Sequence, residues 1–309
     1  MDKKTERLVD VARMYYEQDR TQSEIADQYG ISRPMVSKLL KEARDKGIVT
    51  IRISAPQEES GGALSLMELV GRCFGIYDGV AVPDGPNDQT TNEAVAEAAI
   101  SYLSGLGGTG LGIGWGHIIG DVVKHMEQRE TLVPIGTFVC PLIGNGGVGL
   151  KNYHSNELVR SIAEHSGAQP RFIYSPACVL SEQELKLTRE LDSYHEIYHV
   201  WEKLDVALVN IGNFPSVPDF ASEARYGDQL IRQKAVGRIL NYFMDGQGHI
   251  IRSDTDYAIQ IPLELLSGTR HVVGICSANT SPKAFRGALK TGYLKHFIAP
   301  EHVVREALE

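Results

Sequence analysis

No stretch of this 309-residue sequence approaches the roughly 18 consecutive apolar residues that a membrane helix requires, so we expect no membrane-spanning segment. The first residues, MDKKTERLVDV, carry charges of both signs and no apolar segment, which argues against a signal peptide. The cysteines lie far apart without a CxxC pair, at Cys73, Cys140, Cys178 and Cys276. We therefore expect a cytoplasmic chain with reduced, mostly buried thiols.

Several motifs of enzymes and nucleotide-binding proteins are also missing. The sequence has neither a Walker-A lysine motif nor a GxSxG nucleophile elbow. Gly114, Gly116 and Gly120 do not have the GxGxxG spacing, and the next apolar segment ends in Cys140-Pro141 without an acidic residue for a ribose. These absences argue against NTP hydrolysis, serine hydrolysis and dinucleotide chemistry. We expect no cofactor, no bound metal and no catalytic residues.

The charge is unevenly distributed. The formal net charge is −8, but residues 1–54 hold 11 basic and 9 acidic residues, so the rest of the chain is strongly acidic. Within 33–52 there are six basic residues against two acidic ones. A local basic stripe is what phosphate contacts require, so the acidic net charge does not exclude a nucleic acid. The length itself suits two domains.

The N-terminal segment has the pattern of three short helices. Residues 4–18 carry apolar side chains at helical spacing. Thr21 and Glu24 have the spacing of a capping box, so a second helix begins at Thr21 and ends at Gly30, where a left-handed backbone is favourable. The apolar face of the first helix consists of Leu8, Val11, Ala12 and Tyr15. The residues expected to form a small shared core are Ile25, Ala26, Ile31, Val36, Leu39 and Leu40.

The third of these helices is basic. Ser32 is placed to cap it, and Pro34 lies in its first turn, where a missing N–H does no harm. Two short helices joined by a glycine turn, the second one basic, are typical of a DNA-binding helix-turn-helix. A helical hairpin with a solvated basic face is the alternative. The alternating segment 48–54 predicts a strand that would complete a winged arrangement.

We expect the helix-turn-helix to bind double-stranded DNA. The residues predicted to face DNA are Thr21, Gln22, Ser32, Arg33, Pro34, Ser37, Lys38, Lys41 and Arg44. Arg33, Ser37 and Lys38 lie near the start of the basic helix, where side chains meet base edges. Lys41 and Arg44 are expected at phosphates.

The rest of the chain predicts an α/β domain. Residues 54–62 (SAPQEESGG) have linker composition, which gives a DNA-binding domain over 1–54, a linker over 55–62 and a second domain over 63–309. Strand-like apolar runs occur at 78–83, 109–115, 132–144, 171–179, 205–212, 270–276 and 295–300. Helical patterns occur between them at 91–106, 155–167 and 281–292. This alternation predicts a mostly parallel sheet covered on both faces, with ligands at the carboxyl ends of its strands.

One glycine-rich loop has the chemistry of an anion site. GLGIGWGHIIGDVV (110–123) reads as a strand, a glycine turn and a helix. The N–H groups of Gly116, His117 and Ile118 would then face outward at the positive end of the helix, where they would bind a phosphate or a sugar hydroxyl. The alternative is that the glycines only allow the strand and the helix to pack closely.

The order and spacing of these segments resemble the SorC/DeoR-type sugar-binding regulators. The resemblance rests on the helix-turn-helix block, GIGWG, PLIGNGG (141–147), DVALVNIG (205–212), KAVGRILNYFMDGQG (234–248) and the segment 272–301. It implies an effector domain similar in fold to glucosamine-6-phosphate deaminase and ribose-5-phosphate isomerase. It also implies a homo-oligomer, a dimer of dimers, that binds operators of carbohydrate-catabolic genes and responds to a small, phosphorylated carbohydrate.

The resemblance further implies particular effector-binding residues. For the phosphate end these are Gly114, Trp115, Gly116, His117 and Ile118. Asp245 would bind sugar hydroxyls and Lys283 an anionic group, although a solvated turn aspartate and an exposed lysine are the alternatives. His117 and Ile118 stand where many relatives have Ser or Thr, and CSAN (276–279) replaces the usual Ala-Gly-Gly. A free sugar or polyol is therefore an alternative effector.

Two enzymatic functions compete with this interpretation. HEIYH (195–199) matches the HExxH zinc-protease signature. It lies in a predicted crossover helix, however, in which Tyr194, Ile197 and Trp201 would pack inward and leave the histidines partly exposed. The other alternative is a sugar-phosphate isomerase or deaminase fused to a DNA-binding domain, which would need a positioned base and acid in the sugar pocket.

Overall fold

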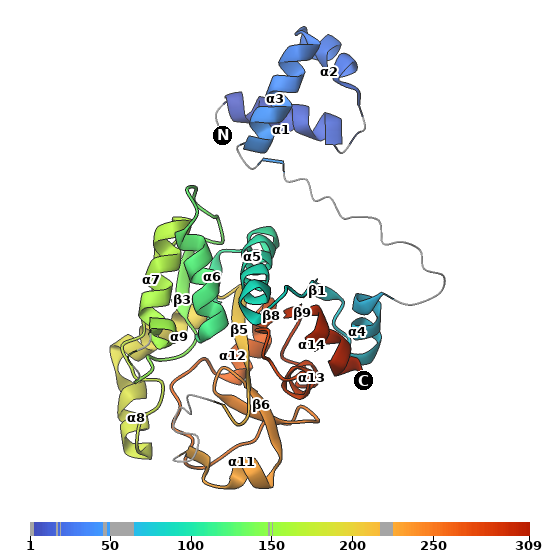
Figure 1. The fold of residues 1–309 in the computed structure, drawn as a ribbon. Helices are drawn as coiled ribbons and strands as arrows, with labels where there is room; N and C mark the ends of the chain where they lie inside the picture. The colour runs from blue at the N-terminus through green and yellow to red at the C-terminus, as the bar shows by residue number, and fades with distance from the viewer. Residues whose placement is uncertain are drawn as a thin grey trace. The chain divides into compact units, whose positions relative to one another are not determined.

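The structure is a computed structural model that describes residues 3–16, 18, 20–45, 48–49, 65–147, 149, 151–216 and 225–309. It divides into two units, Met1–Ala63 and Leu64–Glu309, which are treated separately below (Figure 1). The predicted linker lies outside the described residues. So does the predicted strand over 48–54, apart from residues 48 and 49.

The first unit is helical. Its helices are α1 (Lys3–Tyr16), α2 (Gln22–Tyr29) and α3 (Arg33–Asp45). The predicted capping box is confirmed, since the Glu24 N–H donates to Thr21 Oγ1 and the Thr21 N–H donates to a Glu24 carboxylate oxygen. Gly30 ends α2 with φ 61°, the left-handed conformation that favours glycine.

The predicted core of this unit is also confirmed. Its buried members are Ile25, Ala26, Val36 and Leu40, and the predicted apolar face of α1 adds Leu8, Val11 and Ala12. Tyr15, Ile31 and Leu39 pack against them as partly buried residues. Ala43 joins this core from the last turn of α3. Packing of one face of each helix leaves the opposite face of α3 to the solvent.

The second unit is built on a parallel sheet. Its strands are β1 (Asp78–Val82), β2 (Gly110–Ile113), β3 (Phe138–Pro141), β4 (Gln169–Pro170), β5 (Val206–Asn213), β8 (His271–Ile275) and β9 (His296–Pro300). In the described part of the chain they pair in parallel in the order β1-β9-β8-β5-β2-β3-β4. An antiparallel hairpin, β6 (Ala235–Ile239) and β7 (Tyr242–Asp245), extends from the end of β5.

Helices cover both faces of the sheet (Figure 1). One layer contains α5 (Asp88–Leu106), α6 (His117–Glu127) and α7 (Ser155–Ser166). The other contains α4 (Leu66–Phe74), α9 (Asp192–Trp201), α12 (Leu263–Gly268), α13 (Pro282–Lys290) and α14 (Glu301–Leu308). The remaining short elements are η1 (Lys151–Tyr153), α8 (Glu182–Glu190) and α11 (Gln229–Arg232). The predicted α/β class is thus confirmed, whereas the likeness to the deaminase and isomerase folds stays a prediction.

Side chains of β5 alternate between the two cores. Val206 and Leu208 pack in the cluster with α5, α6 and α7, while Ala207 and Val209 pack in the cluster on the opposite face. All four are almost completely buried. A strand that is apolar on both sides belongs in the middle of a covered parallel sheet, which explains the continuous run VALV in the sequence.

One predicted strand is wrong. The segment 171–179 forms only isolated bridges, and the short β4 precedes it. Its backbone finds other partners, because the Ile173 N–H donates to the Asn156 side chain and the Ala177 N–H to the Asn145 carbonyl. Pro176 has no N–H to donate to a neighbouring strand. The apolar run at 171–179 is therefore a packed loop and not a strand.

Two further sequence predictions concern the whole chain. Cys140 and Cys276 are fully buried, Cys178 is half-buried and Cys73 is exposed, so the thiols are less uniformly buried than predicted. Burial raises the pKa of the Cys140 and Cys276 thiols. Among the helices that the structure describes, none combines the length and hydropathy of a membrane span.

A pair of exposed glycines tests the role of backbone conformation. Gly75 ends α4 with φ 72°, whereas Gly105 lies inside α5, and a Cβ at either would meet no atom within 4 Å. We expect Gly75→Ala to lower the free energy of unfolding by roughly 1 kcal/mol, because alanine is strained in the left-handed region. Gly105→Ala should raise it by about 0.5–1 kcal/mol. Denaturant unfolding of the full chain measures both, and equal changes would contradict this explanation.

Candidate functional site

A polar cavity of about 740 Å³ lies at the carboxyl ends of β2, β5 and β8. The chain leaves β2 toward β3 on one side and leaves β5 toward β8 on the other, so this is the point where the strand order reverses. Open parallel sheets bind ligands at such points. The lining residues are Gln89, Asn92, Glu93, Gly116, His117, Ile118, Asp121, Lys124, His125, Tyr153, Asn210, Ile211, Gly212, Asn213, Pro215, Ser216, Arg238, Ser277, Asn279 and Thr280.

The N-terminus of α6 opens into this cavity. Gly116 is the N-cap residue, with φ 108° and no side chain to cap the helix. The amides of His117 and Ile118 therefore have no partner within the helix and lie at its positive end. The third predicted donor is wrong, because the Gly116 N–H donates to the Asn152 carbonyl at 2.8 Å. The start of α6 thus leaves two of the three predicted amides without a partner inside the helix.

Asn210 gives the cavity an unsatisfied polar group. Its side chain is 8% exposed, and its Oδ1 has no hydrogen-bond partner among the residues that the structure describes. Gly114 lies against it, since a Cβ at that position would come within 2.9 Å of Asn210 Oδ1. A buried oxygen without a partner costs about 1–3 kcal/mol, which a ligand hydroxyl or amine would recover by donating to it.

Arg238 brings a positive charge into the cavity from the β6–β7 hairpin. It pairs in register with Gly212 of β5, and a Cβ at Gly212 would lie 2.9 Å from Arg238 Nε. Because Gly212 has no side chain, the Arg238 guanidinium can extend over β5 toward the cavity. The guanidinium also lies 5.8 Å from the centre of the Phe243 ring, which fixes its orientation. Arg238 is 6% exposed, so its charge is held in a poorly solvated position.

The cavity lining also includes carboxylates. Asp121 lies one turn after His117 on α6, and Glu93 comes from α5. Partial burial raises the pKa of Asp121, against the opposing charges of His125, Lys124 and His117. A cavity lined by an arginine, a helix N-terminus and carboxylates suits a ligand with an anionic end and several hydroxyl groups.

The predicted residues Gly114 and Trp115 lie behind the cavity wall. The Gly114 N–H donates to the Leu208 carbonyl at 2.9 Å, so this residue continues the strand pairing. Trp115 is 1% exposed, and its ring lies edge-on to Tyr153 at 5.8 Å in the core. We therefore correct the prediction for both residues. The loop closes against the core through them and faces the cavity only from Gly116 onward.

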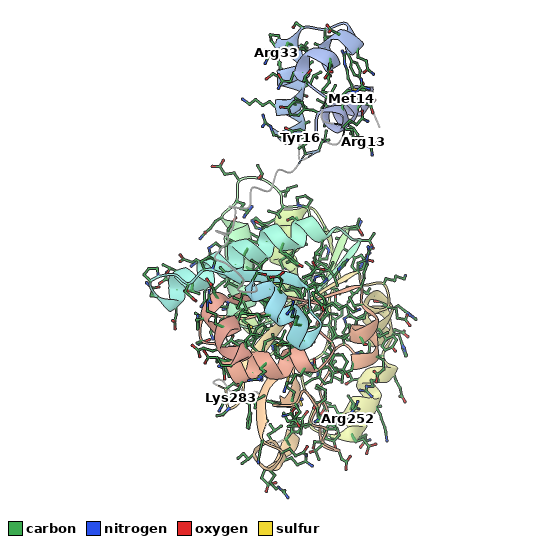
Figure 2. The ribbon with its side chains drawn as sticks, turned by 90° about the vertical axis from the view of Figure 1, so that its right-hand side faces the viewer. Arg13, Met14, Tyr16, Arg33, Arg252 and Lys283 are labelled. Carbon is green, nitrogen blue, oxygen red and sulfur yellow. The ribbon has the colours of Figure 1, made fainter. Side chains whose placement is uncertain are left out.

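Asp245 and Lys283 are not among the cavity-lining residues. Asp245 Oδ1 accepts the N–H groups of Gln247 and His249, so its carboxylate stabilises its own turn, the alternative that the turn sequence had suggested. Lys283 is exposed in the first turn of α13, at the outer edge of the domain in Figure 2. The structure therefore does not support a role for either residue in this cavity.

The predicted DNA-facing residues lie on the surface of the helical unit. All are exposed except Gln22, which is half-buried. Figure 2 shows Arg33 on the outside of the unit, at the start of α3. Thr21, Gln22 and Arg33 share a hollow of about 550 Å³ with Arg20. The start of α3 and the start of α2 thus contribute to one exposed polar surface.

HEIYH lies in α9, as predicted. Tyr194, Ile197 and Trp201 are buried, which confirms their inward packing. His199 Nδ1 lies 2.8 Å from Glu202 Oε2 on the exposed side of the helix. Among the described residues, no group of three His, Cys, Asp or Glu side chains has an arrangement that would hold a metal ion. The zinc-hydrolase alternative therefore gains no support.

Sequence reasoning missed several of the lining residues. Asn210 follows the apolar run VALV at the carboxyl end of a predicted strand, which is a signal for a ligand-facing position that the sequence did offer. Arg238 had no such signal, because its approach to the cavity depends on the pairing of β6 with β5. Asn92 and Asp121 lie on helix faces that read as ordinary solvent-exposed positions.

Comparison with known proteins identifies both parts of the chain. Residues 59–309 match the family described as "Putative sugar-binding domain", and residues 5–46 match "Sigma-70, region 4". The sorbitol operon regulator of Klebsiella pneumoniae is 31% identical over 93% of this chain and 92% of its own length. The deoxyribonucleoside regulator of Bacillus subtilis is 27% identical over 99% of this chain and 98% of its own.

Solved structures agree with these sequence matches. The crystal structure of the full-length sorbitol operon regulator SorC from Klebsiella pneumoniae is similar over 100% of both chains, with a TM-score of 0.71 and 26% identity. The match covers the helix-turn-helix and the α/β unit together. The chain belongs to the SorC/DeoR-type family of sugar-binding transcriptional regulators.

Proposed function

We propose that this regulator controls carbohydrate-catabolic genes by binding operator DNA through α2 and α3 and a small sugar, phosphorylated at one end, through the polar cavity. The observation that carries the effector proposal is the buried Asn210 oxygen without a partner, in a cavity that also contains a helix N-terminus and an arginine. The function is assigned to residues 1–54 for DNA and 63–309 for the effector, with 55–62 as the linker.

The chemistry of the cavity supports an orientation for this effector. The amides of His117 and Ile118 and the Arg238 guanidinium would bind the phosphate, because a helix N-terminus and a guanidinium both favour an anion. Asn210 Oδ1 and the Asp121 carboxylate would accept hydrogen bonds from sugar hydroxyls. Gly116 allows the close approach of the ligand to the backbone, since its position has no side chain and φ is 108°.

Effector binding would control DNA binding through quaternary structure. A symmetric oligomer, a dimer of dimers, would place paired α3 helices in successive major grooves of a pseudo-palindromic operator. The effector can change this arrangement only by its differential affinity for two quaternary states. The proposed contact residues at the DNA are those on the exposed surface described above, with Arg33, Ser37 and Lys38 at bases and Lys41 and Arg44 at phosphates.

Arg33 and Lys41 have different proposed roles that DNA titrations separate. Arg33→Ala should cost about 1–3 kcal/mol on an operator selected from a random library and relax base specificity. Lys41→Ala should weaken binding to selected and unselected DNA equally and should make the affinity less dependent on salt concentration. Lys186→Ala, a similar loss of charge on α8, is the control that should change neither. Equal losses for Arg33→Ala on both DNAs would contradict base contact.

The effector class is tested by thermal unfolding of the full chain. The panel contains ribose 5-phosphate, fructose 6-phosphate and glucitol 6-phosphate, each beside its free form. A ligand that binds only the folded state raises the melting temperature, by an amount that corresponds to about 2.7 kcal/mol at a hundred times its Kd. We expect phosphorylated compounds to do so. A response to free forms alone would contradict the phosphate, and turnover of a bound sugar phosphate would favour the enzyme alternative.

Asn210 is tested by Asn210→Leu, which removes the unpartnered oxygen. The free energy of unfolding should not fall, while affinity for the sugar that stabilises the wild type should weaken about tenfold. The control is Gln260→Leu, because Gln260 is equally buried but its Oε1 accepts the Asn241 N–H. That change should destabilise the protein by about 1–3 kcal/mol and leave affinity unchanged. The reverse pattern would mean that Asn210 is structural.

A further inference from the structure

The loop between β8 and α13 forms one wall of the cavity and is held by three side chains from other elements. Ser277, Asn279 and Thr280 line the cavity. Asn213 of β5 donates from Nδ2 to the Asn279 carbonyl at 2.9 Å and accepts the Ser281 N–H at 2.7 Å. The position of this wall is therefore set by contacts that lie outside the loop itself.

The backbone N–H and the backbone carbonyl of Ala278 each contact a side chain from another helix. The Ala278 N–H donates to Asn92 Oδ1 of α5 at 2.7 Å. The Ala278 carbonyl lies 3.0 Å from Nε2 of His302, in the first turn of α14. Asn92 and His302 thus fix the loop from two different helices, between two residues that face the cavity.

The second nitrogen of His302 also faces an oxygen. Nδ1 contacts Asp84 Oδ1, and the backbone N–H of His302 donates to Asp84 Oδ2 at 3.0 Å. A carbonyl and an ionised carboxylate accept hydrogen bonds but do not donate them. A neutral imidazole has a single N–H, so it cannot donate to both Asp84 and Ala278. The observed geometry is complete only when His302 is the doubly protonated imidazolium.

The surroundings of His302 favour that form. Partial burial opposes the charge, but the Asp84 carboxylate and the Ala278 carbonyl outweigh it, and the pKa of His302 is raised above its usual range. Glu306, on the same helix, adds a further negative charge that acts in the same direction. These are the charged groups that face His302 from its own helix and from the segment before α5. Asn92 and Asn213 do not titrate, so His302 is the proton-sensitive member of the three.

We propose that His302 is a positioning residue of the effector site, whose imidazolium holds the 277–280 loop in the conformation that binds the effector. The proposal rests on the function proposed above for the cavity. It makes effector affinity depend on a proton that does not touch the effector. Because the folded-state pKa is raised, the restraint is fully present below about pH 6.5, the ordinary histidine value, and is lost as the pH rises through the pKa of His302.

The loop is tested first without any effector. Hydrogen exchange of the full chain, corrected for the intrinsic effect of pH, reports the opening of the Ala278 amide. Protection should fall about tenfold as the pH rises from about 5.5 to about 8.5, because one charge-assisted hydrogen bond is lost. In His302→Phe protection should be low at both values. Equal protection in the wild type and His302→Phe at both values would overturn the proposal.

A matched histidine separates this effect from general titration. His249 Nδ1 lies 3.1 Å from Asp245 Oδ2, a His–Asp pair outside the cavity lining. His249→Phe should keep the wild-type pH dependence of the loop. Asp84→Asn should shift the fall in protection to lower pH, because the pKa of His302 loses its main electrostatic support. Loss of the pH step in His249→Phe would assign it to another group and overturn the role of His302.

The effector arm uses the sugar phosphates named above as probes. Between about pH 5.5 and about pH 8.5, wild-type affinity should decrease by about tenfold more than the affinity of His302→Phe. The contributions of the phosphate itself and of the other cavity-lining groups are common to both proteins and cancel in this comparison. Parallel pH profiles in the two proteins would overturn the positioning role alone. A wild type that none of the probes stabilises would instead contradict the proposed effector function, while the exchange experiment still decides whether His302 holds the loop.

Discussion

Strand β5 lies between β2 and β8, with its side chains alternating between the two cores, and its carboxyl end is the point from which the cavity is built. Burial of both faces fixes its register, because a shift by one residue would exchange the contents of the two cores. That register places Asn210, Gly212 and Asn213 at the end of the parallel sheet where the carboxyl ends of its strands lie. The hairpin that supplies Arg238 and the loop that supplies Ser277 both depend on it.

The cavity combines polar groups that are costly to bury. The amides at the start of α6 lack helical partners, Asn210 Oδ1 lacks a partner among the described residues, and Arg238 is almost fully buried. Each is tolerated because the surrounding packing is extensive and already determined by apolar contacts. A buried polar atom without a partner, such as Asn210 Oδ1, is a local cost that is typical of functional sites.

Three glycines leave room for close contacts in this site. Gly116 replaces a capping side chain at the start of α6, and Gly212 lets Arg238 cross β5. Gly114 leaves room for the Asn210 amide. Close packing, one of the two explanations that the sequence left open, is thus seen at Gly114 and Gly212, while ligand binding at Gly116 stays a proposal.

The two units differ in how much of their candidate functional surface can be predicted from short segments of the sequence. In the helical unit, the capping box, the glycine turn and the basic stripe are local features, and each can be read within a few residues. The residues proposed to contact DNA there lie on the exposed surface of α3 and at the start of α2. In the α/β unit, the cavity collects residues from α5, α6, β5, the β6–β7 hairpin and the loop after β8. No short segment of the sequence therefore predicts which residues line the cavity.

The sequence by itself determined the helix-turn-helix, the α/β class, the family and the glycine turn before α6, because periodicity, caps and glycine turns act over short distances. The segment 171–179 shows the limit, since its apolar pattern is compatible with a strand and only the surrounding contacts made it a loop. The tertiary structure decided that Trp115 is core, that Asp245 stabilises its own turn, that Asn210 and Arg238 line one cavity, and that His302 contacts the loop that forms a wall of it. These outcomes depend on strand pairing and on contacts between residues far apart in the chain, which local patterns do not encode.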